Sequence, residues 1–379
     1  MSWHVMPEYD DYETAHESFS WSFPDTYNPA VDCLRKHGDS DPADRVALTD
    51  AATGGEYTYA DLDTQASRLA AGLRDRGVGP GDRVGVVAPQ RPGTIVTHMA
   101  CWLLGAVTVP LTTLFGQDAL SYRLDDAGAV AVVFDPTVSN DIAAASEECP
   151  ALSMAIELEV TPWYHGGRET GRGTDAEFDC EVVARQQLTA GQPDRVDTYE
   201  STVETESALM YTSGSTGPPK GVLHGHALWL GRAAAAYNFF DGLLGPEGVS
   251  WTPADWAWGS ALGGLLMGTL HYGGQVVAAP MQGFDPERAF ELLEKHDVTR
   301  ALIPPTALRM LMSEDADAYD LSLRAIASAG EPLTPEILEW ADDTLEGCAV
   351  NEYYGQTELN LVVGNSSRWF DTRPGSMGK

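Results

Sequence analysis

Short apolar segments with the composition of buried strands alternate with helical segments along most of this chain. In the first clear case, Leu62, Ala66, Leu69 and Leu73 recur at helical spacing, and a glycine-rich turn then leads into the apolar run 84–88. Repeated alternation of this kind predicts an α/β fold with largely parallel sheets. The predicted strands are 46–49 with its hairpin partner 57–59, and 84–88, 107–109, 130–134, 208–211, 275–279, 300–303 and 324–328. One predicted helix begins near residue 60 and another ends near residue 105. The other predicted helices cover residues 118–127, 141–149, 227–240, 286–295, 305–312 and 335–342.

The alternation forms two series, separated by the polar, glycine-rich stretch 161–195, which has no sustained period. We interpret that stretch as a surface crossing or insertion. The sequence therefore predicts two stacked α/β subdomains. Residues 1–30 are an aromatic and acidic lead-in, and we expect residues 31–379 to form one large domain.

The formal net charge of −33 excludes a general binder of nucleic acid or of anionic membranes. Aromatic residues are plentiful, so the acidic residues belong to a folded surface rather than to a disordered chain. Only four lysines accompany nineteen arginines, a bias typical of proteins from salt-accumulating halophiles, although an ordinary acidic mesophilic protein remains the alternative.

Neither a metal framework nor a membrane segment is indicated. The five cysteines are far apart without a C-x-x-C pair, so we expect buried free thiols. The longest nearly apolar stretch, 99–111, is too short to span a bilayer, and the acidic N-terminus lacks the features of a signal peptide. These features predict a cytoplasmic protein; its oligomeric state cannot be read from them.

The most informative segment follows a predicted strand and combines glycines, hydroxyl residues and one of the four lysines. Exposed backbone N–H groups, short hydroxyl donors and a positive charge together suit a phosphate-binding loop. A Walker A loop is disfavoured, because Lys220 follows Pro219 and precedes Gly221 instead of a Ser or Thr. The segment reads Tyr211-Thr212-Ser213-Gly214-Ser215-Thr216-Gly217-Pro218-Pro219-Lys220-Gly221.

Residues 212–221 match the T-S-G-[ST]-[ST]-G-x-P-K-G loop of the AMP-forming adenylate-forming enzymes, so the chain resembles that superfamily. Residues 329–333, A-G-E-P-L, resemble the strand end that lies against adenine in the family. Residues 352–358, E-Y-Y-G-Q-T-E, resemble its Y-G-x-T-E motif. The resemblance covers nearly the whole chain from about residue 31, and it is closest to acetyl- and medium-chain acyl-CoA synthetases.

The resemblance implies roles for individual residues. The loop would hold the pyrophosphate portion of ATP, with Thr212 and Lys220 as catalytic residues. Thr357 would contact the α-phosphate and Glu358 would ligate Mg²⁺, since a carboxylate beside a phosphate requires a cation between them. The implied nucleotide-binding set is Thr212, Ser213, Gly214, Ser215, Thr216, Gly217, Lys220, Gly330, Glu331, Pro332, Glu352, Tyr353, Tyr354, Gly355, Gln356 and Thr357.

A tryptophan-rich segment, 251–259, resembles the acyl-pocket segment of acyl-CoA synthetases, in which Trp258 would line the pocket. The three tryptophans could equally be ordinary core residues. Acetyl-specific relatives have a Trp where Gly355 stands here, so the resemblance also implies a pocket open to medium-length acids. His224 and His226 are a possible metal pair, but solvent-facing or capping roles fit them better.

The reaction that the resemblance implies activates a carboxylic acid, expected to be a medium-chain fatty acid, with ATP to acyl-AMP and pyrophosphate, and CoA then displaces AMP. The family also has a C-terminal domain that follows the P-G-S-M-G-K segment, so we expect a chain ending at Lys379 to be inactive or weakly active alone, with that domain missing or supplied separately. Two alternatives stay open. One is a non-catalytic nucleotide-binding fragment or subunit, and the other is an aryl-CoA ligase or amino-acid adenylation enzyme of the same superfamily.

The excess of acidic residues predicts that salt stabilises the fold. At low ionic strength a charge of −33 destabilises the compact state by self-repulsion, whereas in molar salt the Debye length falls to about 3 Å. We expect the melting temperature, followed by circular dichroism, to rise steeply from low to molar KCl. A melting temperature that is indifferent to KCl would mean an ordinary acidic surface.

Overall fold

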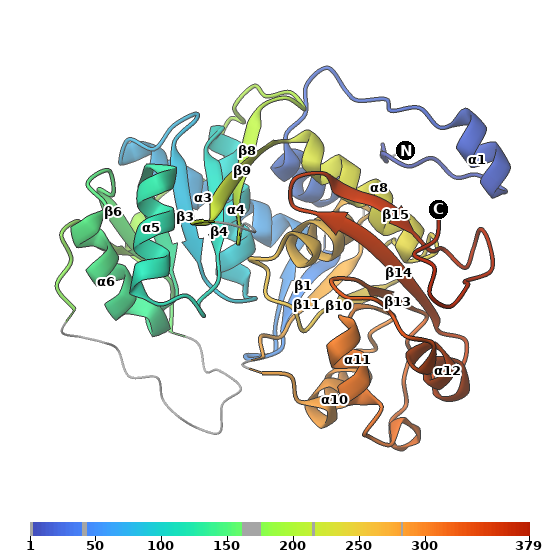
Figure 1. Ribbon diagram of the computed structural model, residues 1–379. Helices are drawn as coiled ribbons and strands as arrows, with labels where there is room; N and C mark the ends of the chain where they lie inside the picture. Colours follow the sequence, from blue (N-terminus) through green and yellow to red (C-terminus); the bar gives the residue numbers. More distant parts are fainter. Residues whose placement is uncertain (1–2, 40–43, 161–175, 214–216, 282) are drawn as a thin grey trace. The chain divides into compact units, whose positions relative to one another are not determined.

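The computed structural model describes residues 3–39, 44–160, 176–213, 217–281 and 283–379 (Figure 1). The chain divides into two compact units. Unit 1 comprises residues 1–23, 228–254 and 259–379, and unit 2 comprises residues 24–227 and 255–258. Unit 2 contains the first predicted series and also the strand predicted at 208–211, and the rest of the second series lies in unit 1. The α/β fold class is confirmed.

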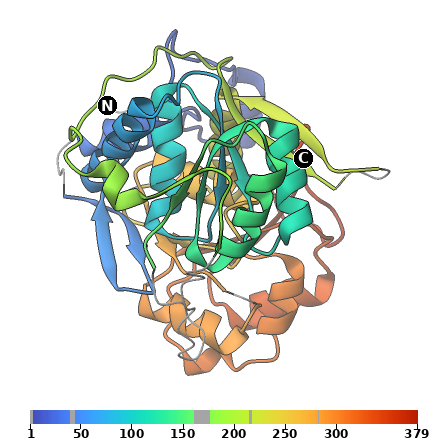
Figure 2. The same ribbon diagram turned by 90° about the vertical axis from the view of Figure 1, so that its left-hand side faces the viewer.

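Unit 2, whose ribbon runs from blue through green to yellow-green in Figure 2, is built on a seven-stranded sheet. Its strand order is β7-β6-β5-β3-β4-β8-β9. All neighbours pair in parallel except β8 and β9, which form an antiparallel hairpin. The strands are β3 (Arg83–Val87), β4 (Val107–Leu111), β5 (Ala129–Phe134), β6 (Met154–Glu157), β7 (Glu181–Ala184), β8 (Glu206–Thr212) and β9 (Lys220–Gly225). Strands β1 (Val46–Asp50) and β2 (Gly55–Thr58) form an antiparallel hairpin that is not part of this seven-stranded sheet.

Helices cover both faces of this sheet, because the chain moves across the sheet in one direction from β3 to β4 and in the opposite direction from β4 to β5. A right-handed crossover from β3 to β4 puts α4 on one face, and the reversed crossover from β4 to β5 puts α5 on the other. The apolar cluster between α5, α6 and the strands includes Leu120, Leu124 and Ile142. The main helices are α3 (Tyr59–Asp75), α4 (Pro92–Leu104), α5 (Gln117–Ala127) and α6 (Ser139–Glu148), and shorter ones are Val31–Arg35, α2 (Lys36–Gly38), Pro136–Val138 and α7 (Arg185–Thr189).

Local sequence signals set where these helices begin and end. The Thr58 hydroxyl accepts a hydrogen bond from the Asp61 N–H while the Asp61 carboxylate accepts one from the Thr58 N–H, which is a capping box at the start of α3. Helices α4 and α5 end at Gly105 and Gly128, whose left-handed φ values of 74° and 60° suit glycine. These signals explain why the sequence predicted the helices of unit 2 closely.

In unit 1, six strands run in the order β15-β14-β13-β12-β10-β11, parallel except for the antiparallel pair β14 and β15. They are β10 (Val249–Trp251), β11 (Gln275–Ala278), β12 (Arg300–Leu302), β13 (Ala325–Ser328), β14 (Ala349–Gln356) and β15 (Asn360–Gly364). The helices are α1 (Tyr12–Ser18), α8 (Ala227–Phe239), the π-helix Ser260–Met267, α9 (Gly268–His271), α10 (Pro286–Lys295), α11 (Pro305–Leu311), the turn Ala316–Ala318 and α12 (Pro335–Thr344).

The sequence did not predict every element. Strands β6, β9, β10, β14 and β15 were missed, because each is short or lies inside a segment read as a motif. Residues 176–195 of the predicted surface crossing contain β7 and α7, and residues 161–175 lie outside the described residues. Within the described ranges, no helix combines the length and apolar character needed to cross a membrane.

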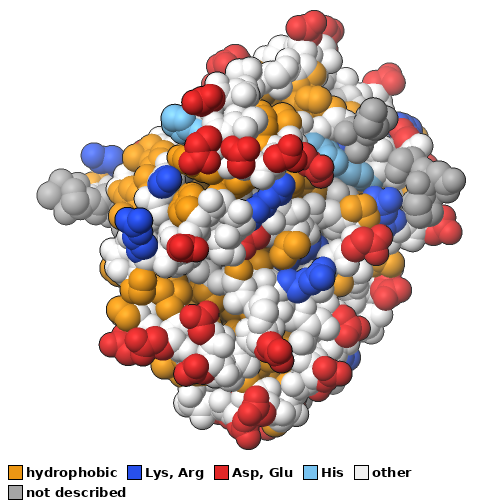
Figure 3. Space-filling view, turned by 90° about the vertical axis from the view of Figure 1, so that its right-hand side faces the viewer, with side chains coloured by type: hydrophobic (Ala, Val, Ile, Leu, Met, Phe, Trp, Pro, Cys, Tyr) orange, Lys and Arg blue, Asp and Glu red, His pale blue; other side chains and the backbone are white. Residues whose placement is uncertain are grey.

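Acidic side chains are spread over the face of the molecule in Figure 3 instead of gathering in one patch.

The interior of unit 2 holds a fully formed ion pair. The Arg91 and Asp135 side chains are 6% and 1% exposed, and their Nη1 and Oδ2 atoms are 2.6 Å apart. Asp135 also accepts hydrogen bonds from the N–H and hydroxyl of Thr137, so the pair anchors the turn that follows β5.

We predict that Asp135→Asn destabilises the protein by about 3–5 kcal/mol, because it leaves the Arg91 charge buried without a partner. The matched control is Asp194→Asn, which removes an ion pair to Arg68 between side chains that are 71% and 44% exposed. Exposed pairs contribute little, so the control should unfold almost as the native chain does. Urea denaturation measures both, and equal effects of the two substitutions would contradict the prediction.

Candidate nucleotide-binding site

A pocket of about 430 Å³ in unit 1 lies at the carboxyl ends of β13 and β14. These strands are parallel neighbours, with Ser328 opposite Glu352, so the segments that follow them come together. In open α/β sheets ligands bind at this edge. The pocket is lined by Gly330, Glu331, Pro332, Leu333, Glu352, Tyr353, Tyr354, Gly355, Gly375 and Met377.

The two motifs that the sequence analysis singled out in unit 1 therefore share one pocket. Seven predicted residues line it, from 330–332 and 352–355. Leu333, Gly375 and Met377 were not assigned to a site. The P-G-S-M-G-K segment, which contains Gly375 and Met377, was noted in the sequence only as part of the family pattern.

One hydrogen bond joins the two walls of this pocket. The Glu352 side chain is 6% exposed, and its Oε1 accepts a hydrogen bond of 3.1 Å from the backbone N–H of Leu333. Gly330 has a φ of 97° with open space where a Cβ would lie, so its backbone conformation, not crowding, requires glycine. The 330–333 loop is thereby held against β14.

Glu331 is positioned by side chains from α11. Its carboxylate accepts hydrogen bonds from the Thr306 hydroxyl and from Arg309 Nη1, the latter at 3.3 Å. The hydrogen bond from Thr306 and the charge of Arg309 hold the pKa of Glu331 below its ordinary value. The carboxylate is therefore ionised at neutral pH and accepts hydrogen bonds at the pocket edge.

The predicted phosphate and metal residues follow at the turn between β14 and β15. Gln356 ends β14, and Thr357 and Glu358 lie in the turn, with the Glu358 side chain exposed. Over the described ranges Glu358 makes no hydrogen bond or ion pair, and no group of three potential metal ligands occurs. A single free carboxylate fits Mg²⁺ that keeps most of its ligands from water and substrate phosphates.

Gly355 lines the pocket, and the neighbouring strand β15 also requires a glycine at this position. A Cβ there would lie 2.3 Å from the carbonyl oxygen of Asn360 and 2.7 Å from Leu361 Cδ2. Close approach of β15 alone therefore requires glycine in this hairpin. A bulkier residue at position 355 would need the hairpin itself to move.

The predicted phosphate loop lies in unit 2, where it joins β8 to β9. Thr212 and Lys220 are directly opposite each other in this antiparallel pair. Gly217 has a φ of 94°, and Gly214, Ser215 and Thr216 lie outside the described residues. The loop thus connects two strands, so its donors do not belong to a helix N-terminus as they do in a Walker A loop.

The residues at both ends of this loop are anchored to α5. The Tyr122 hydroxyl donates to the Pro219 carbonyl at 2.9 Å, and the Tyr211 hydroxyl donates to Asp126 at 2.6 Å. Burial and the hydrogen bond to Asp126 raise the pKa of Tyr211 well above its ordinary value. The exposed Lys220 side chain has no ion pair among the residues that the structure describes, although the chain is strongly acidic.

The three tryptophans of the acyl segment have different surroundings. Trp251 and Trp256 are 0% and 1% exposed and are core residues, whereas Trp258 is 59% exposed. Asp255 is partly buried, which raises its pKa, and it accepts hydrogen bonds from the Thr112 hydroxyl at 2.6 Å and from the Ala257 N–H. These bonds anchor residues 255–258 in unit 2, and Trp258 is the accessible tryptophan of the three.

The two histidines do not form a metal site in the described residues. His226 is not solvent-facing as expected, because it is fully buried and its Nδ1 lies 2.8 Å from the Ser207 hydroxyl. Burial lowers the pKa of His226 to about 3, so the ring is neutral. It is a structural residue at the start of α8.

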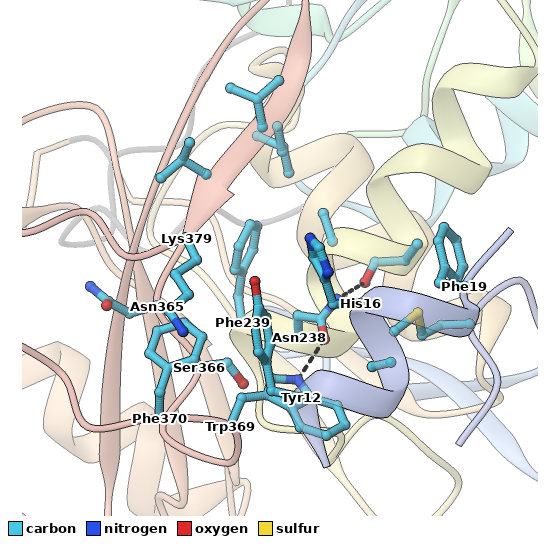
Figure 4. Close-up of a pocket in the computed structure, with 18 of the residues that line it drawn as sticks. Tyr12, His16, Phe19, Asn238, Phe239, Asn365, Ser366, Trp369, Phe370 and Lys379 are labelled. Atoms are coloured by element: carbon cyan, nitrogen blue, oxygen red, sulfur yellow. Dashed lines mark hydrogen bonds between the residues drawn. The ribbon is translucent and has the colours of Figure 1, made fainter. Parts of the chain in front are cut away.

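A second pocket in unit 1, of about 350 Å³, contains none of the predicted site residues. Figure 4 shows it between α1, α8 and the last residues of the chain, with aromatic rings on its walls. Trp369 Nε1 donates to Asn238 at 2.9 Å, and Lys379 Nζ lies 4.4 Å from the centre of the Tyr12 ring. These contacts pack the last residues of the chain against both α8 and the N-terminal segment.

Known proteins resemble the chain in sequence and in fold. The chain is 33% identical over 90% of its length to an acetyl-coenzyme A synthetase of Burkholderia lata, and 31% identical over 94% to one of Laribacter hongkongensis. It covers 54% and 56% of those proteins, so it spans about half the length of these curated relatives.

Solved structures also resemble the chain in fold. A Brucella canis acyl-CoA synthetase superposes with a TM-score of 0.81 at 26% identity, covering 98% of this chain and 66% of that one. An anthranilate CoA ligase in complex with anthranoyl-AMP has a TM-score of 0.80 at 22% identity over 94% of this chain and 65% of its own, which shows the shared fold. The sequence model described as AMP-binding enzyme matches residues 34–379. The chain therefore belongs to the AMP-binding enzyme family.

Proposed function

We propose that this chain contributes the nucleotide-binding part of an AMP-forming acid–thiol ligase. The enzyme would convert a carboxylic acid and ATP to acyl-AMP and pyrophosphate, and then acyl-AMP and CoA to acyl-CoA and AMP. The observation that carries the proposal is the shared pocket at the ends of β13 and β14, which gathers 330–332 with 352–355. The acyl-CoA synthetases and CoA ligase similar to this chain support the same reaction class.

The residues of the chain would act mainly by positioning and by charge neutralisation. In-line attack brings the carboxylate of the acid toward the negatively charged α-phosphate, so donors must offset the repulsion. Lys220 and Thr212 would hold the distal phosphates, and Thr357 would donate to the α-phosphate. Mg²⁺, when bound by Glu358 and the substrate phosphates, would neutralise further negative charge.

The role of Lys220 predicts a difference between two nucleotides. We expect Lys220→Ala to weaken ATP binding by about 1.5–3 kcal/mol, the size of a charge-assisted hydrogen bond, and to leave AMP binding nearly unchanged because AMP has no distal phosphates. Isothermal titration of the 379-residue chain with ATP·Mg²⁺ and with AMP measures both. Lys295→Ala, at the exposed end of α10, is the control and should change neither. Equal losses for ATP and AMP would contradict the assigned role.

We further propose that the acid is of medium length, from butyrate to octanoate or a branched equivalent. The support is Gly355, which leaves its part of the pocket wall without a side chain. The names of the relatives do not favour one acyl length. Some are acetyl-coenzyme A synthetases, whereas another, 28% identical, is a mitochondrial acyl-coenzyme A synthetase of the mouse. Acyl length therefore has to be measured.

We expect hexanoate to be preferred to acetate, because each buried methylene adds about 0.8 kcal/mol until the pocket is filled. The measurement is acid-dependent pyrophosphate release, with the 379-residue chain joined to the downstream segment of a relative if it is inactive alone. The control is the same series without CoA, which reports the adenylation step only. Preference for acetate would disprove the proposed acyl length and leave the reaction class intact.

A further inference from the structure

The nucleotide pocket has a third wall, which the sequence motifs did not assign to the site. Gly375 and Met377 line the pocket beside the 330–333 loop and the end of β14. Over the described ranges, neither of these two residues makes a backbone hydrogen bond of its own. Their positions therefore depend on Ser376, which lies between them, and on the contacts that hold Ser376.

A buried asparagine holds this residue. Asn365 is 2% exposed, and its Nδ2 donates a hydrogen bond of 2.9 Å to the Ser376 carbonyl. The backbone N–H of Asn365 donates to the Glu352 carbonyl at 2.7 Å. Glu352 is also the residue whose side chain accepts a hydrogen bond from the Leu333 N–H. Asn365 therefore connects the third wall to the residue that joins the other two.

The backbone around Asn365 is fixed from two sides. Asp241, which follows α8, has a φ of 52°, an uncommon conformation for a residue other than glycine. Its carboxylate accepts hydrogen bonds from the Ser366 hydroxyl at 2.9 Å and from the Asn351 side chain at 3.1 Å. Ser366 and Asn351 directly adjoin Asn365 and Glu352 in the sequence. The Asn365 amide therefore donates from a fixed place beside β14.

We propose that Asn365 is a positioning residue for nucleotide binding, whose amide holds the 375–377 wall in the place that completes the pocket for AMP and ATP. This inference rests on the proposed function. A wall that is in place in only a fraction of the molecules lowers the apparent affinity for the nucleotide by that fraction. A residue needed only for folding would instead change stability and leave the affinity of the folded molecules unchanged.

The nearly isosteric substitution Asn365→Asp tests the amide directly. At neutral pH it replaces the N–H donor with a charged acceptor, which the Ser376 carbonyl oxygen repels. We expect AMP to bind roughly tenfold more weakly, as measured by isothermal titration of the 379-residue chain at one KCl concentration. Asn365→Ala removes the donor without adding a charge and should weaken AMP binding by a smaller factor.

A pH series then separates positioning from a general loss of structure. Burial raises the pKa of the introduced carboxyl, and its neutral form carries an O–H that can donate to the same carbonyl. We expect the AMP affinity of Asn365→Asp, divided by that of the native chain at the same pH, to recover as the pH falls from about 8 to about 5. The corresponding ratio for Asn365→Ala should stay flat.

Other titrating groups cancel from these ratios, because all three proteins and the AMP phosphate share them. The charged residues in the segments that contact Asn365 or its neighbours are Asp241, Glu352, Arg368 and Lys379.

Asn28→Asp is the matched control. Asn28 lies in unit 2 and is 6% exposed, and its Nδ2 donates to the Trp102 carbonyl at 2.7 Å. The same exchange of a buried amide for a carboxyl is thus made at a residue that does not line the nucleotide pocket. It should lower the melting temperature and leave the AMP affinity of the folded molecules within about twofold.

The outcomes separate this inference from the proposed function. If the native chain binds AMP and Asn365→Asp binds it equally well, or if the loss does not recover at low pH, the positioning role is overturned and the proposed function stands. If Asn365→Asp does not fold, Asn365→Ala decides: a weaker AMP affinity supports the role and a native affinity overturns it. If the native chain does not bind AMP, the proposed function falls and the inference falls with it.

Discussion

The hydrogen bond between the Leu333 N–H and the buried Glu352 carboxylate joins the two segments on which the nucleotide pocket depends. It is possible only because β13 and β14 are parallel neighbours in register, with Ser328 opposite Glu352. Parallel strands release their chains at the same edge of a sheet, and the loops that follow meet there. The pocket is therefore a consequence of strand order first and of the individual side chains second.

Several buried arginines in this protein are held either by carboxylates or by backbone carbonyl oxygens. Arg91 with Asp135 and Arg35 with Asp63 are closed ion pairs that stabilise turns and helices in unit 2. Arg123 and Arg300 are buried too, and they donate to the carbonyl oxygens of Ala119 and Leu243. A carboxylate partner is therefore not the only way in which this fold accommodates a buried guanidinium.

The acidic surface gives the few exposed cations a special position. Repulsion among 56 acidic residues disfavours anionic ligands in general, so an anion binds only where local donors outweigh the overall field. Lys220 stands at the base of a hairpin loop without an ion-pair partner in the described structure, and the strand residues at both ends of that loop are anchored to α5 by tyrosine hydroxyls. The anchoring fixes the positions from which the loop starts and ends.

Much of this protein could be predicted from its sequence alone, because helix periodicity, caps and short apolar runs are local signals. They predicted the α/β class, most helices and the motifs 212–221, 330–332 and 352–358. Only the tertiary structure decided that the last two motifs share a pocket, that the first is a β-hairpin loop, that His226 is buried, and that Asn365 donates to the Ser376 carbonyl. These facts depend on strand order and on burial, which join residues far apart in the chain, and no local pattern records them.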